Sequence, residues 1–256
     1  MTAPLLATRG LAVTIAGIRV CSGLDLVVAP GQCWAILGRN GTGKTTLLHT
    51  LAGLRSPAAG TIEFLGRPLA ATGRRELARL RGLLPQDDSD AFPATVLETV
   101  LIGRHPHLSR WQLEGADDLR IARAALADTD MPGTDARDIR TLSGGERRRV
   151  ALAALLAQQP QLFLLDEPSS HLDLAHQIAL LDRLVGAVRP SGKALVMVVH
   201  DINLAARYCD HALLLADGMA LAGSAPDLLR AERLSAVFGI GLQAVAGPRG
   251  NIFMPE

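Results

Sequence analysis

With 256 residues, the chain can form one large domain or two modest ones, and its 48% of hydrophobic residues supply a full core. The net charge of +1 excludes a general attraction to nucleic acid, so any basic patch must be local. Cys21, Cys33 and Cys209 have no C-x-x-C spacing, which argues against a disulfide framework or a zinc site and for a reducing compartment.

The N-terminal stretch MTAPLLATRGLAV does not have the pattern of a signal peptide, because no basic segment is followed there by a sustained apolar one. No apolar run elsewhere approaches the roughly 18 residues that a membrane span needs. We therefore expect a chain that does not itself cross a bilayer, although a partner could hold it at one.

A buried strand followed by a loop and a helix is predicted near residue 40. Residues 33–38, CWAILG, form a short apolar run that ends in glycine, which is typical of a buried strand. Residues 44–53, KTTLLHTLAG, have helical spacing that stops at Gly53. Trp34 lies within the strand, and we expect it to be part of the core.

The loop between this strand and this helix reads GRNGTGKT and matches the P-loop pattern G-x-x-x-x-G-K followed by Ser or Thr. Its glycines let backbone N–H groups approach phosphate oxygens, and the helix N-terminus adds its positive dipole end. The chain has 24 arginines and only two lysines, so Lys44 marks a position that needs a compact ammonium. We expect Lys44 to reach the β- and γ-phosphates of a nucleotide and Thr45 to hold Mg²⁺. The residues expected to form the phosphate site are Gly38, Arg39, Asn40, Gly41, Thr42, Gly43, Lys44, Thr45 and Thr46.

The middle of the chain differs in character, and we interpret residues 87–158 as a helical insertion into an α/β core. Residues 110–130 are rich in Ala, Leu, Arg and acidic residues with helical spacing, which predicts a helix. His105 and His107 have no further ligand nearby, so they are a weak metal signal and better explained as ordinary residues of the insertion. The arginines 147–149 are interpreted as a solvated or interface face.

Residues 142–160, LSGGERRRVALAALLAQQP, combine a helix start with a second candidate anion site. Ser143 and Glu146 fit a capping box, which does not need the intervening glycines. Gly144 and Gly145 expose backbone N–H groups at the helix start, an arrangement that favours an anion. Because one chain cannot easily use two phosphate sites on one nucleotide, we expect this segment to serve the nucleotide bound to a second subunit.

Two further buried strands are predicted to end in polar residues. Residues 161–168, QLFLLDEP, end at Asp166 and Glu167, and residues 193–201, KALVMVVHD, end at His200. Such strands alternating with helices indicate a parallel sheet, whose carboxyl edge is where ligands bind. With a P-loop beside them, Asp166 would serve Mg²⁺ and Glu167 would orient and polarise an attacking water. A solvated strand end is the alternative for each.

The last clear signal is a hairpin over residues 211–223, where Asp217 and Gly218 separate two apolar arms. We expect a single domain over 1–256. Its parts are an α/β core at 1–86 and 159–225, the helical insertion at 87–158 and a C-terminal tail at 226–256.

The P-loop, LSGGE, LLDEP, SSHLD at 169–173 and His200 occur in an order that resembles the ATP-binding subunit of an ABC transporter. The resemblance extends from about residue 10 to 225. It implies a P-loop NTPase parallel-sheet core, an N-terminal antiparallel β subdomain and an inserted helical subdomain. It also implies that ATP and Mg²⁺ are the cofactors. Two copies would close head to tail, with each ATP between the P-loop of one and LSGGE of the other.

Further residue roles follow from this resemblance alone. Gln86, in LLPQD, would be the Q-loop residue that contacts Mg²⁺ and the water and reports to a permease. Asp173 would lie at the dimer seam, and His200 would bond the γ-phosphate. Ile15 stands where the family usually has an aromatic residue that stacks on adenine, so only apolar contact with the base is expected there.

The chain resembles importer ATPases, which implies two membrane-spanning permease subunits, an indirect link to a periplasmic binding protein and a place at the cytoplasmic face of the inner membrane. Residues 83–107, 171–177 and 200–210 resemble the subfamily that imports haem, ferric siderophores and cobalamin. The stretch 91–96 favours haem and 207–210 favours siderophores. Haem is our first expectation, with the other two open.

Two functions of other classes remain as alternatives. One is a soluble ABC-type ATPase that acts as a scaffold, as in iron–sulfur cluster assembly, and has no membrane partner. The other is a DNA-repair ATPase of the same superfamily, which would carry a long coiled-coil insertion. The uninterrupted stretch 142–166 and the balanced charge argue against DNA repair.

Overall fold

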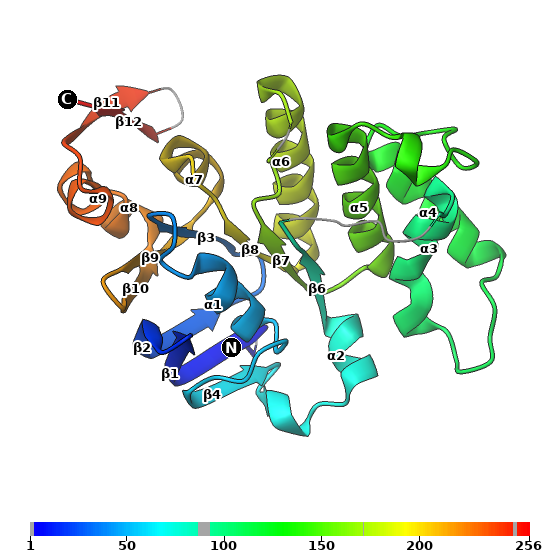
Figure 1. Ribbon diagram of the computed structural model, residues 1–256, viewed down its shortest axis with the longest axis horizontal. Coiled ribbons are helices and arrows are strands. Elements are labelled where there is room, and N and C mark those ends of the chain that lie inside the picture. The colour runs from blue at the N-terminus through cyan, green and yellow to red at the C-terminus, as the bar shows by residue number, and fades with distance from the viewer. Residues whose placement is uncertain (1–2, 87–92, 171, 248–249) are drawn as a thin grey trace.

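The computed structural model describes residues 3–86, 93–170, 172–247 and 250–256 and has a mostly parallel sheet at its centre (Figure 1). All neighbouring strands of this sheet run parallel except β9 and β10, the pair at one edge, which is antiparallel. In spatial order the strands are β10 (Met219–Ser224), β9 (His211–Ala216), β3 (Cys33–Gly38), β8 (Ala194–Val198), β7 (Leu162–Asp166) and β6 (Arg81–Leu84). The parallel core predicted from the apolar runs is confirmed.

The central sheet is buried on both faces, which explains why its strands are apolar throughout. Along β3, Cys33, Ala35 and Leu37 join one apolar cluster, while Trp34 and Ile36 join the other. The first cluster includes residues of several helices: α5 (Gly144–Gln158), α6 (Leu174–Val188), α7 (Ile202–Tyr208), α8 (Ala225–Leu228) and α9 (Ala231–Phe238). Helix α1 (Lys44–Leu51) lies on the second face.

An antiparallel sheet packs beyond α1, as the resemblance implied for the N-terminal part. Its strands, in spatial order, are β2 (Ile18–Val28), β1 (Leu6–Ile15), β4 (Ala59–Phe64) and β5 (Arg67–Pro68). At Gly60 a Cβ would lie 2.4 Å from the carbonyl oxygen of Gly10, so β1 and β4 can approach closely only with glycine there. The chain then passes through η1 (Leu69–Ala71) and α2 (Arg74–Leu80) to reach β6.

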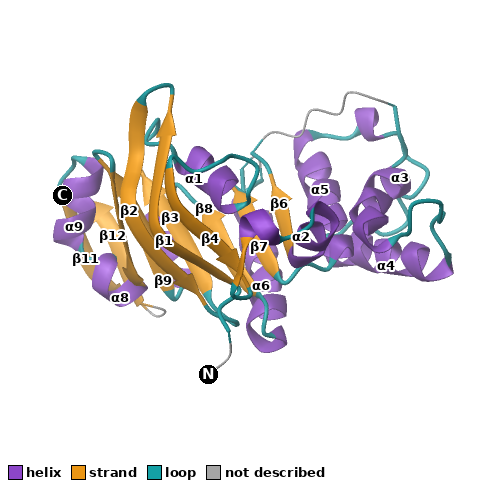
Figure 2. Cartoon of the chain, turned by 90° about the horizontal axis from the view of Figure 1, so that it is seen from below, coloured by secondary structure: helices purple, strands orange, loops and turns teal. Residues whose placement is uncertain are grey.

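The inserted helices form a separate lobe beside the sheets (Figure 2). This lobe contains α3 (Val96–Leu101), η2 (Ile102–His107), α4 (Ala116–Asp128), η3 (Ile139–Thr141) and α5. The helix predicted over 110–130 begins only at Ala116, because Gly115 caps it through a hydrogen bond from its N–H to the Asp118 carboxylate. Trp111 and Leu113, which lie before this start, are 88% and 84% exposed.

The predicted hairpin is present, and the tail after it is folded. Asp217 and Gly218, with φ of 49° and 73°, form the two-residue turn between β9 and β10. After α8 and α9, a hairpin of β11 (Leu242–Gly247) and β12 (Gly250–Pro255) docks on α7, where the side chain of Asn203 bonds the backbone of Phe253 at 2.8 and 3.2 Å. No helix within the described ranges combines the length and apolar character of a membrane span.

Candidate active site

The loop 39–43 lies between β3 and α1 at the carboxyl edge of the central sheet, and the glycines at its two ends, Gly38 and Gly43, pack closely against neighbouring strands. Gly43 precedes α1 with φ of 90°, and a Cβ there would lie 2.5 Å from Cγ2 of Val20. A Cβ on Gly38 would lie 2.5 Å from the carbonyl oxygen of Leu215. The two ends of the loop therefore pack against β2 and β9.

Lys44 begins α1 and is only 6% exposed. Its ammonium donates to the carbonyl oxygens of Gly38 at 2.9 Å and Arg39 at 3.0 Å. Burial lowers the pKa of Lys44, while the neighbouring carboxylates of Glu167 and Asp166 act in the opposite direction. The positive charge of Lys44 thus lies inside the loop, close to the carboxylates of Asp166, at the end of β7, and Glu167, which follows it. Thr46 is buried next to it, whereas Arg39, Asn40 and Gly41 are exposed.

Asp166 ends β7 with no exposed surface, and neither of its carboxylate oxygens has a well-aligned hydrogen-bond partner among the described residues. Burial raises the pKa of Asp166, and the nearby Thr45 hydroxyl opposes this rise. A buried carboxylate beside the Thr45 hydroxyl suits a hard cation such as Mg²⁺. No group of three or more His, Cys, Asp or Glu side chains in the described ranges could hold a metal.

Glu167 and His200 were predicted from separate motifs, and the structure brings them into contact. The Glu167 carboxylate accepts a hydrogen bond from Nε2 of His200, because β7 and β8 are adjacent parallel strands. Glu167 has φ of 48°, a conformation that is strained for a non-glycine residue and is often found at active sites. Its side chain is 16% exposed and that of His200 is 46% exposed, so the pair faces outward from the sheet edge.

Gln86 follows β6, the strand next to β7, and is exposed. Parallel pairing of Leu84 with Leu165 places Gln86 and Glu167 at neighbouring strand ends. The structure thus gathers the P-loop, Asp166, Glu167, His200 and Gln86 along one edge of the sheet. Residues 87–92, which follow Gln86, and His171, within the stretch 169–173, lie outside the described residues.

The segment predicted to serve a second nucleotide lies elsewhere. Ser143 and Glu146 form the predicted capping box at the start of α5, with hydrogen bonds of 2.8 and 3.2 Å. Arg137 pairs with Glu146 at 2.7 Å and, together with the cap, lowers the pKa of that carboxyl to about 2. Ser143 and Gly144 are exposed, and Gly145 is half-buried. Figures 1 and 2 show α5 among the inserted helices and well away from α1, so this segment does not meet the P-loop of its own chain.

Asp173 lies at the start of α6, and Ile15 lies at the end of β1. Asp173 caps α6 by accepting a hydrogen bond from the backbone N–H of His176 at 2.9 Å, and its side chain is 67% exposed. Ile15 ends β1 at 37% exposure, and Ile18, its partner across the tight turn, is 68% exposed. They form a small apolar surface. Trp34 is in the core, as predicted, stacked on His211 with ring centroids 4.6 Å apart.

One residue of the site was missed by the sequence reasoning. We interpreted the arginines 147–149 as a solvated or interface face, but Arg148 is only 5% exposed and its guanidinium reaches the ends of β6 and β7 within its own chain. A signal for this was present, because Leu152 and Leu155 lie four and seven residues later on the same helical face and are both buried.

Comparison with known proteins decides the family. The model of the ABC transporter family matches residues 21–170. The chain belongs to the ABC transporter family. Hemin import ATP-binding protein HmuV of Gloeobacter violaceus is 42% identical over 253 residues, which is 96% of this chain and 91% of the relative.

Other similarities agree. Cobalamin import ATP-binding protein BtuD of Halobacterium salinarum is 39% identical over 231 residues, 90% of this chain and 57% of the relative. A solved structure described as a metal-chelate type ABC transporter in an inward-facing conformation has a TM-score of 0.86 at 29% identity, covering 99% of this chain and 98% of that one. This ABC protein is therefore an ATP-binding subunit that hydrolyses ATP in transport, and the predicted fold class is confirmed.

Proposed function

We propose that this ABC ATPase powers uptake of haem through a partner permease and hydrolyses ATP between two copies of the chain. The observation that carries the choice of cargo is the 42% identity to a hemin import ATP-binding protein along 96% of the chain. The 39% identity to a cobalamin import protein makes cobalamin the second candidate, and ferric siderophores are the third. The assigned place is the cytoplasmic face of the inner membrane, with a periplasmic binding protein as an indirect partner.

The first step is capture of the phosphates by the P-loop. Backbone N–H groups of residues 39–46 and the N-terminal end of α1 offer hydrogen bonds and positive charge to them. The ammonium of Lys44 exchanges its carbonyl partners on Gly38 and Arg39 for oxygens of the β- and γ-phosphates. Those carbonyls hold the ammonium in place beforehand, so little reorganisation is needed on binding.

Mg²⁺ fits this site, and we assign Thr45, Asp166 and Gln86 to hold it directly or through water. When bound, the ion neutralises charge on the phosphate oxygens. The buried carboxylate of Asp166, which has no well-aligned donor among the described residues, supports this assignment. Its raised pKa indicates a carboxylate that gains from a cation close by.

Hydrolysis then requires a water in line with the γ-phosphorus. Glu167 accepts a hydrogen bond from this water and polarises it, and His200 donates to the γ-phosphate. The contact between the two side chains supports this assignment, because both must lie within reach of the same phosphate. Most of the rate enhancement comes from positioning and charge stabilisation, so turnover is slow until every part of the site is assembled.

The remaining contacts come from a second copy in head-to-tail orientation. Its Ser143, Gly144, Gly145 and Glu146 face the γ-phosphate, and Asp173 lies at the seam. Exposure of this segment and its distance from α1 in the same chain support a partner in trans. ATP joins the two copies, and hydrolysis separates them.

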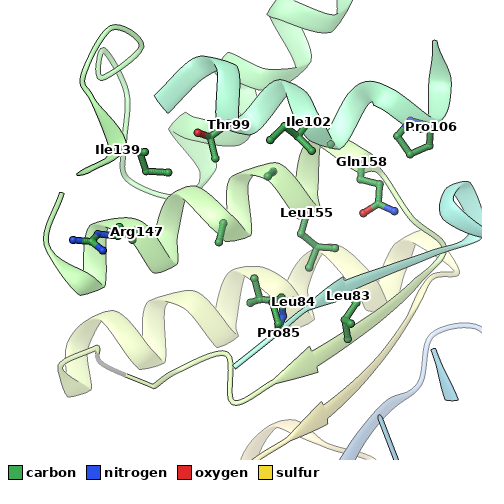
Figure 3. A pocket seen from close by; sticks show the side chains of 13 residues that line it. Leu83, Leu84, Pro85, Thr99, Ile102, Pro106, Ile139, Arg147, Leu155 and Gln158 are labelled. Atoms are coloured by element: carbon green, nitrogen blue, oxygen red, sulfur yellow. The ribbon is translucent and has the colours of Figure 1, made fainter. Parts of the chain in front are cut away.

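A cavity of 320 Å³, lined in part by Pro85, which precedes Gln86 in the sequence, suits a helix of the permease (Figure 3). Figure 3 shows side chains converging on it from β6, from α3 and η2, and from α5. Its lining is mainly apolar and joins the sheet to the inserted helices, including Leu83, Pro85, Ile102 and Leu155. A permease helix bound here would contact both the sheet and the inserted lobe, so a movement of the lobe relative to the sheet would shift the bound helix.

Growth of the source bacterium under iron starvation tests the cargo. The chromosomal allele is replaced by Glu167→Gln, and haemin, a ferric siderophore or neither is supplied. Loss of growth on haemin alone is the expected result. Loss on the siderophore alone would move the assignment there, and normal growth on both would favour cobalamin or a soluble scaffold. Glu114→Gln is the matched control, since Glu114 pairs with His105 in the inserted lobe and is no part of the site.

A further inference from the structure

Arg148 lies on α5, in the inserted lobe, but its guanidinium contacts the backbone that follows β7. Nη2 donates to the carbonyl oxygens of Asp166 at 2.6 Å and Glu167 at 2.9 Å. Nε donates to the carbonyl oxygen of Pro168 at 3.3 Å. These are three consecutive peptide groups, with Glu167 at their centre.

The same side chain also reaches the neighbouring strand end. Nη1 donates to the carbonyl oxygens of Pro85 and, at 3.4 Å, Gln86. An arginine has five N–H donors in a rigid fork, and here each of them has a backbone carbonyl as partner. Arg148 therefore links three segments that are far apart in sequence: α5, the end of β6 and the end of β7.

The backbone at Glu167 needs such support. Its φ of 48° is unfavourable for a residue with a side chain, and such a conformation persists only where the surroundings over-determine it. The N–H of Glu167 donates to the carbonyl oxygen of Val198 at 3.2 Å, and Arg148 holds the carbonyl groups of the peptides on both sides of its Cα. The orientation of the backbone at Glu167 determines the direction in which its carboxylate points from the sheet edge.

We propose that Arg148 is a positioning residue that holds the Glu167 carboxylate in its place for hydrolysis and links this placement to Gln86 and to α5. The inference rests on the role proposed above for Glu167. Because α5 begins at the segment Ser143–Glu146, a shift of the inserted lobe when two copies close would be passed through Arg148 to the backbone of Glu167. ATP binding itself does not depend on this link, since Lys44 and the P-loop lie on β3 and α1.

The test compares Arg148→Gln with the unmodified full-length protein for kcat, KM, the Kd of ATP and the thermal midpoint. We expect kcat to fall by about 10- to 100-fold, the usual effect of a misplaced catalytic group, with the Kd of ATP unchanged. Arg148→Lys is the second variant and folds more readily, because it keeps the charge but offers one ammonium in place of the fork. It should also lose kcat without losing affinity for ATP.

Arg104→Gln is the matched control. Arg104 is 7% exposed and likewise joins separate segments, with hydrogen bonds to Asp118, to the carbonyl oxygen of Ala157 and to Gln159 at 2.8 to 3.1 Å. This variant should lose thermal stability while its folded fraction keeps the normal kcat.

Wild-type kcat in either Arg148 variant would overturn the inference, as would equal losses of kcat and ATP affinity. Glu167→Gln, measured in parallel, separates the two proposals. If it is inactive while the Arg148 variants are normal, only the role of Arg148 is lost. If it hydrolyses ATP normally, the role of Glu167 and the inference built on it both fall.

Discussion

The P-loop and the segment Ser143–Glu146 are both proposed to contact ATP, yet the chain supports them differently. Lys44 and Asp166 are 6% and 0% exposed, and Gly38 and Gly43 pack directly against neighbouring strands. Ser143–Glu146 lies at the surface of the inserted lobe, where its capping box and the ion pair with Arg137 hold it. We call the P-loop edge of the sheet the sheet half-site and the segment Ser143–Glu146 the surface half-site. The sheet half-site is preformed within one chain, whereas the surface half-site is proposed to act only when it meets the sheet half-site of a second copy. We infer that the sheet half-site determines the affinity for ATP. The rate of hydrolysis depends on whether the two half-sites come together.

The largest effect is expected from Glu167→Gln, which leaves the preformed half intact but removes the group that polarises water. Hydrolysis should fall on the order of 10²–10³-fold, while ATP still binds. The variant should therefore accumulate as an ATP-bound dimer, detectable by phosphate-release assay and by size-exclusion chromatography with ATP. A variant with a normal rate of phosphate release would show that another group acts on the water.

Asp166→Asn tests how strongly the sheet half-site is built for a cation. Burial raises the pKa of Asp166 above its unfolded value, so its contribution to stability is fully present below about pH 3.9 and is lost as pH rises through the folded pKa. The variant should therefore melt a few degrees higher than wild type at neutral pH and lose this advantage in acid. It should also lose Mg²⁺-dependent hydrolysis. Equal melting temperatures across the pH range would contradict a carboxylate that is destabilised by burial.

A smaller effect, a gain in affinity for ATP, is expected from Ile15→Tyr, which adds an aromatic ring to the sheet half-site only. Ile15 and Ile18 are 37% and 68% exposed and offer a base apolar contact but no ring to stack on. Aromatic stacking contributes about 1 kcal/mol, so the Kd of ATP should fall several-fold. Titration with a fluorescent ATP analogue measures this, with Ile18→Tyr as the matched control. If Ile15→Tyr has no effect, the base lies elsewhere.

The smallest effect is expected at the surface half-site, from Glu146→Gln. Glutamine preserves the capping box but loses the ion pair with Arg137, which contributes less than about 1 kcal/mol at a partly exposed position. Because the folded pKa of Glu146 is lowered to about 2, wild type should be the more stable above about pH 4.3 and lose this advantage as pH falls towards 2. Urea unfolding at several pH values measures this difference, and a Glu146→Gln variant more stable than wild type at neutral pH would contradict the prediction.

Sequence patterns predicted the parts of the molecule whose structure depends on local chemistry. The P-loop, the strands 33–38 and 161–168, the capping box at Ser143 and the turn at Asp217–Gly218 all follow from short-range rules on glycine, apolar runs and caps. The start of α4 was missed because Gly115 and its hydrogen bond with Asp118 prevail over the apolar spacing of the preceding residues.

Features that depend on long-range contacts could not be predicted in this way. Arg148 joins strand ends that are separated from it by 18 and 63 residues in sequence, and no local pattern encodes those partners. The folded C-terminal hairpin is fixed on α7 by Asn203, which bonds Phe253 fifty residues later. The roles of individual site residues, including Gln86 and Asp173, stay predictions until variants are measured.

The central claim, that each ATP site is shared between two copies, can be tested by mixing two inactive variants. Lys44→Ala disables the sheet half-site. Gly144→Asp places a carboxylate at the surface half-site, where a side chain meets no neighbouring atom within 4 Å. In a head-to-tail dimer of one copy of each, both lesions fall in one site and the other site is intact. An equal mixture should therefore recover about a quarter of wild-type ATP hydrolysis. A mixture no more active than either variant alone would contradict a site shared in trans.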